Sequence, residues 1–113
     1  MFRGVHGFDW DNGNRDKCRK HGVPAETIEN VFCGRPLMVQ PNVTNSKSEQ
    51  RFRAVGKTAE GRSVFVVFTL RDREGERLIR PISARYMHNE EIETFEKENP
   101  RLQDRRGSRG LRR

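Results

Sequence analysis

The apolar run Val64–Phe68 constrains the fold more than any other segment of the chain. Successive side chains of a strand point to opposite faces, so a run without polar residues is apolar on both faces. A strand of this kind belongs in the middle of a sheet. Turn signals at Glu60-Gly61 before the run and around Gly75 after it predict antiparallel partners on both sides.

The segments around this run predict an α+β fold with two N-terminal helices, four antiparallel strands and a C-terminal helix. The helices are expected from Asp9 or Asp11 to about Lys20, from Pro24 to Gly34, and from Asn89 to Pro100. The strands are expected at Leu37–Gln40, Gln50–Thr58, Arg62–Leu70 and Arg77–Arg85.

Pro81 interrupts the last of these strands. Because proline has no backbone N–H, it predicts either an edge strand or a β-bulge at this point. In a regular strand Arg80 and Ser83 face opposite sides, whereas Ser83 and Arg85 share a side. A bulge changes that relation, so the pattern leaves the geometry of the three residues open.

The charge of the chain is concentrated at its end. The 113 residues are 32% hydrophobic and carry a formal charge of +7. This suits one small domain that binds nucleic acid or an acidic partner. Residues 101–113 hold six arginines and one aspartate and so account for +5 of that charge. We expect one folded domain over residues 1–100 and a basic tail over 101–113 that is disordered when free.

Several classes of protein are not expected. An apolar run of membrane-spanning length and a secretion signal are both missing from the sequence, which predicts a cytoplasmic protein. Cys18 and Cys33 do not form a CxxC pair and are expected to be reduced thiols. The histidines do not pair with these cysteines at ligand spacing, so we expect no metal site and no cofactor.

Two groups of cations are candidates for binding phosphate. The first is the stretch Arg80-Pro-Ile-Ser-Ala-Arg85, where arginine forks match phosphate oxygens. The second is Arg51, Arg53 and Lys57, which share one face of their strand. The alternatives are structural: pairing with acids such as Glu49, or a solvated strand face.

Other polar residues allow two interpretations each. Lys20 and His21 end the first helix, where they complement its dipole. Histidine is also the usual general base near neutral pH. Tyr86 either stacks on a nucleic-acid base or covers the edge of the sheet.

Taken together, these segments resemble the BrnT toxin family, and the similarity extends over about residues 8–98. The matching stretches are Phe8-Asp-Trp-Asp11, Arg19-Lys-His-Gly-Val23, Pro24 to Phe32, Glu49-Gln-Arg-Phe-Arg-Ala-Val-Gly56, Val64-Phe-Val-Val-Phe-Thr69, Arg80-Pro-Ile-Ser-Ala-Arg85 and Glu90–Glu98. The joint order and spacing carry the resemblance, not one motif. Tyr86 stands where many relatives carry a basic residue, and the tail beyond Pro100 lies outside the family pattern.

The resemblance implies a RelE-like fold and cleavage of RNA without a metal. It also implies a cognate antitoxin with a ribbon-helix-helix DNA-binding end, so that operator DNA is contacted only through the antitoxin. The positions that match the family's recurrent polar residues are Arg80, Ser83, Arg85, Lys20, His21 and Arg51.

The resulting hypothesis is an RNA endonuclease that inhibits translation. Arg80 and Arg85 are expected to stabilise charge on the phosphate, with Arg51 positioning the RNA backbone. His21 is the expected base, with Glu49 as its rival. The alternative hypothesis is a non-catalytic RNA-binding or co-repressor module that uses the same arginines for affinity alone.

Overall fold

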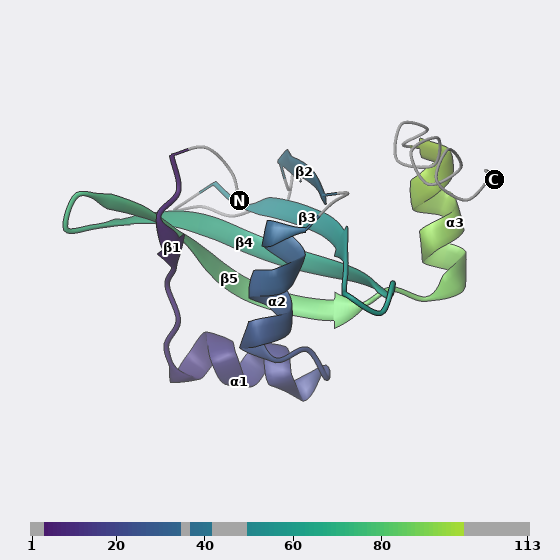
Figure 1. Cartoon of the computed structure of the whole chain (residues 1–113), viewed down its shortest axis with the longest axis horizontal. Coiled ribbons are helices and arrows are strands. Elements are labelled where there is room, and N and C mark those ends of the chain that lie inside the picture. The colour runs from purple at the N-terminus through teal and green to yellow at the C-terminus, as the bar shows by residue number, and fades with distance from the viewer. Residues whose placement is uncertain (1–3, 35–36, 42–49, 99–113) are drawn as a thin grey trace.

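A computed structural model describes residues 4–34, 37–41 and 50–98, and these residues form an α+β fold of three helices and five strands (Figure 1). The elements are β1 (Gly7–Phe8), α1 (Asn12–Lys20), α2 (Ala25–Cys33), β2 (Leu37–Pro41), β3 (Phe52–Lys57), β4 (Ser63–Arg73), β5 (Glu76–Tyr86) and α3 (Asn89–Glu98). Glu49 and the arginine-rich tail over residues 101–113 lie outside the described residues.

The five strands form one sheet in the order β1-β5-β4-β3-β2. The central position expected for the run Val64–Phe68 is confirmed, because β4 has β5 on one side and β3 on the other. The tight turn expected around Gly75 is confirmed too, and both Glu74 and Gly75 have positive φ there.

The expected four-stranded antiparallel sheet is wrong in one respect, because β1 adds a fifth strand parallel to β5. The N–H of His6 donates to the carbonyl of Arg77 (2.9 Å), and that of Asp9 donates to the carbonyl of Ile79 (2.8 Å). A strand of two residues is too short to show an alternating pattern, so this segment reads in the sequence as a lead-in.

Local sequence signals set the ends of the two N-terminal helices. Asp11 caps α1, since its carboxylate accepts a hydrogen bond from the N–H of Asn14 (3.0 Å). Gly22 stops this helix in a left-handed conformation, with φ of 83°. Pro24 is the N-cap of α2, whereas it was expected to be the first residue of the helix. Gly34 ends α2 as predicted.

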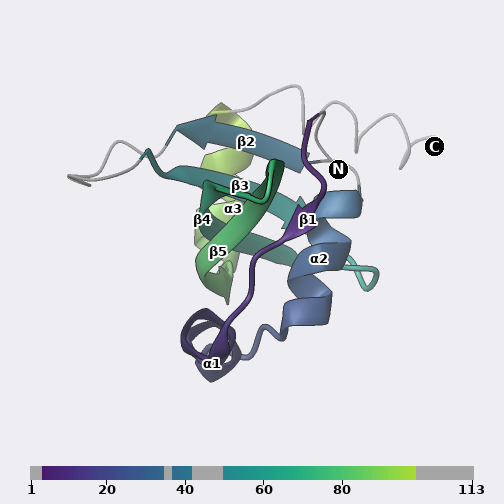
Figure 2. The same cartoon turned by 90° about the vertical axis from the view of Figure 1, so that its left-hand side faces the viewer.

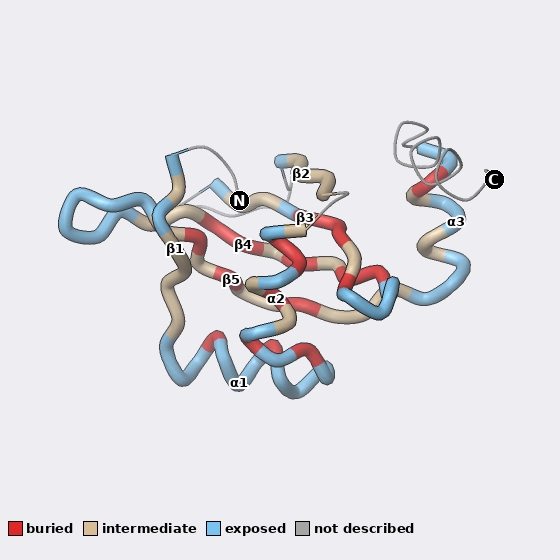
Figure 3. The backbone as a smooth tube through the Cα atoms, viewed as in Figure 1, coloured by how far each residue is buried: buried red, intermediate tan, exposed pale blue. Residues whose placement is uncertain are grey.

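One face of the sheet packs against α2 to form the core (Figures 2 and 3). The ring of Phe32 from α2 meets that of Phe68 from β4 edge-on, with centroids 5.1 Å apart, and Phe52 stacks on Phe68 at 5.4 Å. Such aromatic pairs add stability beyond the area that they bury. Helix α1 runs along β5, and α3 stands at the far end of the sheet (Figure 1).

The sheet's other face carries the cations of interest, and we call it the open face. The strand register places Arg85 opposite Phe65 and Arg53 opposite Val67, both on this face. Their strand neighbours Ala54 and Ala84 are buried on the core side. The predicted alternation of β3 is therefore confirmed for Arg53.

Candidate functional site

A β-bulge in β5 decides which side chains lie together. Pro81 is opposite Phe68 and Ser83 is opposite Val67, so Ile82 is the additional residue in β5. A bulge shifts the alternation of side chains by one position. Arg80, Ser83 and Arg85 therefore all lie on the open face. The bulge expected at Pro81 is confirmed; β5 is an inner strand, paired with β1 and β4.

The side-chain amide of Asn14 attaches α1 to this bulge. Its nitrogen donates to the carbonyl of Pro81 (2.8 Å) and to that of Asp9 (3.1 Å), and its oxygen accepts from the N–H of Asp11 (2.8 Å). Asn14 is itself buried. A buried carbonyl needs a hydrogen-bond donor, and Asn14 of α1 supplies one to the carbonyl of Pro81 at the bulge.

An open hollow of about 680 Å³ lies between the first turn of α1 and the bulge. Four cations line it: Lys17, Arg51, Arg71 and Arg80. We call it the basic hollow. Cations that converge from separate elements are the arrangement that binds phosphate groups.

Arg80 is the most constrained of these cations. Its side chain is 19% exposed, and its Nη2 lies 2.7 Å from Oδ2 of Asp11, which also lines the hollow. Its Nη1 lies 3.6 Å from Oδ2 of Asp9, a carboxylate that Arg73 also contacts at 2.9 Å. The hydrogen bond from the backbone of Asn14, followed by that from Arg80, lowers the pKa of Asp11.

Arg51 contributes a donor that is not satisfied. Its Nε is buried, and within residues 4–34, 37–41 and 50–98 it has no hydrogen-bond partner. A buried donor without an acceptor costs free energy, so this nitrogen favours a ligand that brings an oxygen. Arg51 and Arg80, which the sequence places in different strands, thus meet at one hollow.

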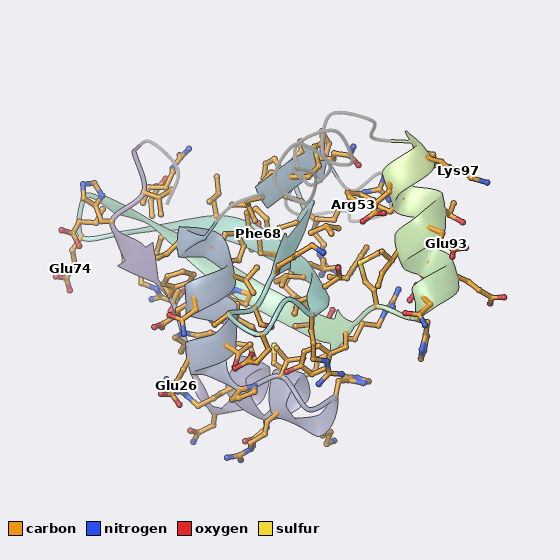
Figure 4. The ribbon with its side chains drawn as sticks, turned by 45° about the vertical axis from the view of Figure 1, so that its right-hand side comes forward. Glu26, Arg53, Phe68, Glu74, Glu93 and Lys97 are labelled. Carbon is orange, nitrogen blue, oxygen red and sulfur yellow. The ribbon has the colours of Figure 1, made fainter. Side chains whose placement is uncertain are left out.

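A second depression, of about 470 Å³, lies between α3 and the open face. It is the α3 groove, and Arg53 and Arg85 line it (Figure 4). Arg85 contacts Glu91 of α3 (2.8 Å) and lies over the ring of Phe65, 5.0 Å from its centroid. The two arginines of the stretch Arg80–Arg85 therefore serve different depressions on the same face.

The Arg85–Glu91 pair makes the attachment of α3 depend on pH. Hydrogen bonds from Arg85 and then from the backbone of His88 lower the pKa of Glu91 from 4.5 to about 2. A carboxyl whose pKa is lowered by folding stabilises the folded state above its unfolded pKa, and this contribution disappears as pH falls through the folded value. We expect α3 to loosen as pH falls from about 4.5 to about 2.

This dependence is tested with Glu91→Gln, which keeps the size of the side chain but not its charge. Amide hydrogen exchange in α3 should be faster than in wild type at about pH 7 and should change less on acidification. Glu93→Gln, on an exposed position of the same helix (Figure 4), is the matched control. Equal exchange in the two variants would show that the pair does not hold α3.

The remaining predicted residues lie elsewhere. Lys20 ends α1 and His21 caps it, and neither lines the basic hollow, although Lys17, one helical turn before His21, does. Tyr86 lies on the core side of the sheet, where the guanidinium of Arg62 stands 3.5 Å from its ring centroid. Lys57 lines a small pocket between β3 and α3.

Sequence reasoning missed three residues of the basic hollow: Asp11 as a neighbour of Arg80, Lys17, and Arg71. Asp11 was expected only as a helix cap. Lys17 has the spacing of an exposed helix residue, and Arg71 lies near a turn. No local pattern in the chain distinguishes these positions from other surface residues.

Two further findings concern the described residues only. Within them, no three or more His, Cys, Asp and Glu side chains are grouped so as to hold a metal ion. In the same part of the chain no helix has both the length and the apolar composition needed to cross a bilayer.

The model of a family described as "Ribonuclease toxin, BrnT, of type II toxin-antitoxin system" matches residues 10–91. That range extends from the start of the α1 cap to the first turn of α3 and includes the basic hollow. Among curated proteins, none matches the chain closely enough to count as a relative.

Proposed function

The chain belongs to the BrnT family of ribonuclease toxins of type II toxin–antitoxin systems, and on that premise we propose that it is a metal-independent RNA endonuclease of the RelE-like type that inhibits translation. The basic hollow is the observation that carries this proposal. Its four cations supply, without a metal ion, the positive charge that a reacting phosphate requires.

In the proposed reaction the 2′-hydroxyl oxygen attacks the adjacent phosphorus atom, and the bond from phosphorus to the 5′ oxygen breaks. The proton of the 2′-hydroxyl passes to a base, and the 5′ oxygen receives a proton as it leaves. Negative charge builds on the phosphoryl oxygens between these events. Arg80 and Arg51, both of which line the basic hollow, stabilise it.

The open face provides a path for the RNA on either side of the reacting phosphate. Ser83 lies between Arg80 and Arg85 on this face, and its hydroxyl is a donor for a phosphate oxygen. Arg85 and Arg53 in the α3 groove then bind the neighbouring part of the backbone. We assign these residues to affinity and positioning, and Arg80 and Arg51 to charge stabilisation.

The base remains a choice between two residues. His21 has the better chemistry, but it does not line the basic hollow, which reaches along α1 only as far as Lys17. Glu49 lies outside the described residues and precedes Arg51 by two positions in the sequence. The position of Arg51 in the hollow favours Glu49, and a pH–rate profile separates the two, since on acidification an imidazole base loses activity at a higher pH than a carboxylate base does.

A toxin of a type II system has an antitoxin partner, and we propose that this one carries a ribbon-helix-helix DNA-binding end. Its acidic or apolar segments would cover the open face, because that face holds both the cations and half-buried apolar residues such as Phe65. The complex would then reach operator DNA through the antitoxin. The site of action is the cytoplasm, where mRNA is translated.

The proposed chemistry predicts cleavage that continues in EDTA and requires the 2′-hydroxyl. Purified protein should cut single-stranded RNA equally well with and without EDTA, and it should leave the DNA of the same sequence intact. Loss of cleavage in EDTA, with recovery on adding a divalent ion, would contradict the metal-independent mechanism. RNA that is bound but never cut would favour the non-catalytic alternative.

A further inference from the structure

Asp11 stands among the cations of the basic hollow and holds one of them. We infer that its carboxylate occupies the place of an RNA phosphate on Arg80, that a phosphate displaces it on binding, and that Lys17 and Arg71 complete the phosphate site. This inference rests on the proposed function and extends it to three residues that the sequence did not assign to a phosphate site.

The geometry of Asp11 suits such an exchange. Its Oδ2 lies 2.7 Å from Nη2 of Arg80, the distance of a charge-assisted hydrogen bond. The Asp11 side chain is 53% exposed, whereas that of Arg80 is 19% exposed. A ligand from solvent can therefore reach the contact between the carboxylate and Arg80, while the guanidinium stays against the sheet.

The exchange leaves the helix cap in place. Oδ1 of Asp11, not Oδ2, accepts the hydrogen bond from the N–H of Asn14 (3.0 Å). Oδ2 is the oxygen that contacts Arg80. A phosphate that takes over Arg80 thus competes with one oxygen of the carboxylate and does not require α1 to unwind.

The charge of the hollow favours an anion with several oxygens. Four cations and one carboxylate line it, an excess of three positive charges among these side chains. The buried Nε of Arg51 is a donor in need of an acceptor. A phosphodiester brings two charged oxygens that several donors can share, so it fits the site better than the single displaced Oδ2 does.

The competition has a measurable consequence in salt dependence. When a phosphate replaces a carboxylate on a cation, the phosphate releases a counterion but the freed carboxylate attracts one. The net release of counterions is therefore small. Arg80 also contacts Asp9 (3.6 Å), so removing the Asp11 carboxylate should raise the contribution of Arg80 without making it complete. Each phosphate neutralised on a single strand changes the slope of log affinity against log salt by about 0.7, which is the upper limit of the expected change.

The test is Asp11→Asn, since asparagine is as good a helix cap as aspartate but carries no charge. The control is Asp16→Asn, which makes the same charge change on an exposed position of α1 that pairs with Arg19 (2.9 Å). The probe is a single-stranded RNA with 2′-O-methyl groups, which has no nucleophile and cannot be cut.

We expect Asp11→Asn to bind the probe about two- to fivefold more tightly than Asp16→Asn does, in line with the strength of an exposed ion pair. Its salt slope should be steeper, by at most about 0.7. Equal affinities and slopes in the two variants would overturn the exchange, as would failure of both variants and the wild type to bind the probe.

Lys17→Gln tests the further ligands, with Lys97→Gln as its control. Lys97 projects from α3, away from the hollow (Figure 4). Lys17→Gln should bind the probe several-fold more weakly than Lys97→Gln and with a shallower salt slope. Equal binding would remove Lys17 from the site. Because the probe reports binding alone, a protein that shows these differences but cuts no RNA would refute the proposed function and not the phosphate site.

Discussion

Replacing Arg80 with alanine should slow RNA cleavage by roughly 10²–10³-fold, the usual effect of removing one group that stabilises charge in a transition state. Arg80 lies on the open face just before the bulge, and two carboxylates hold it in place in the basic hollow. Cleavage of a labelled RNA by purified protein, under single-turnover conditions, measures the effect directly.

Two companion variants make this result specific. Arg77→Ala removes the same charge from the same strand, but Arg77 is exposed and pairs with Asp72 (3.0 Å) near the turn, so its rate should be close to wild type. Arg80→Lys keeps a charge but loses the bidentate fork, and it should recover only part of the rate. Full activity of Arg80→Ala with an unchanged thermal midpoint would refute the assignment.

Asn14→Ala should cause the largest loss of stability among polar substitutions in α1. One amide makes three hydrogen bonds, to the carbonyls of Pro81 and Asp9 and from the N–H of Asp11. Truncation leaves the buried Pro81 carbonyl without this partner, which costs about 1–3 kcal/mol, and the capping box adds to the loss. Thermal or urea unfolding measures it, with the exposed Asn30→Ala as control.

The same variant should also weaken RNA cleavage, although Asn14 is not expected to touch the reacting atoms. Its amide fixes the backbone of β5 at Pro81, beside the bulge, and Pro81 directly follows Arg80 in the strand. Asn14→Ala should therefore lower the cleavage rate at temperatures where it is still fully folded. A destabilised variant with wild-type cleavage would mean that the bulge keeps its shape without α1.

The sequence was sufficient for features that depend on neighbouring residues. The apolar run in β4 predicted a central strand, and the helix expected from Asp9 or Asp11 to about Lys20 agrees with α1. Pro81 predicted an irregularity in the last strand. Each of these features depends on a few consecutive residues and their periodicity. The missed strand β1 is the exception, since its two residues carry no period and it forms only because β5 offers free backbone groups.

The sequence alone therefore determined the element order, the central strand, the cation content of the stretch Arg80–Arg85 and, through its motifs, the family. Tertiary structure alone decided that Arg80 belongs with Lys17, Arg51 and Arg71, and that Arg85 belongs with α3. The physical reason is the one additional residue in β5, which shifts every later side chain by one position, together with α1 packing against that point. Both groupings bring together residues that are far apart in the chain, so no local sequence pattern encodes the site.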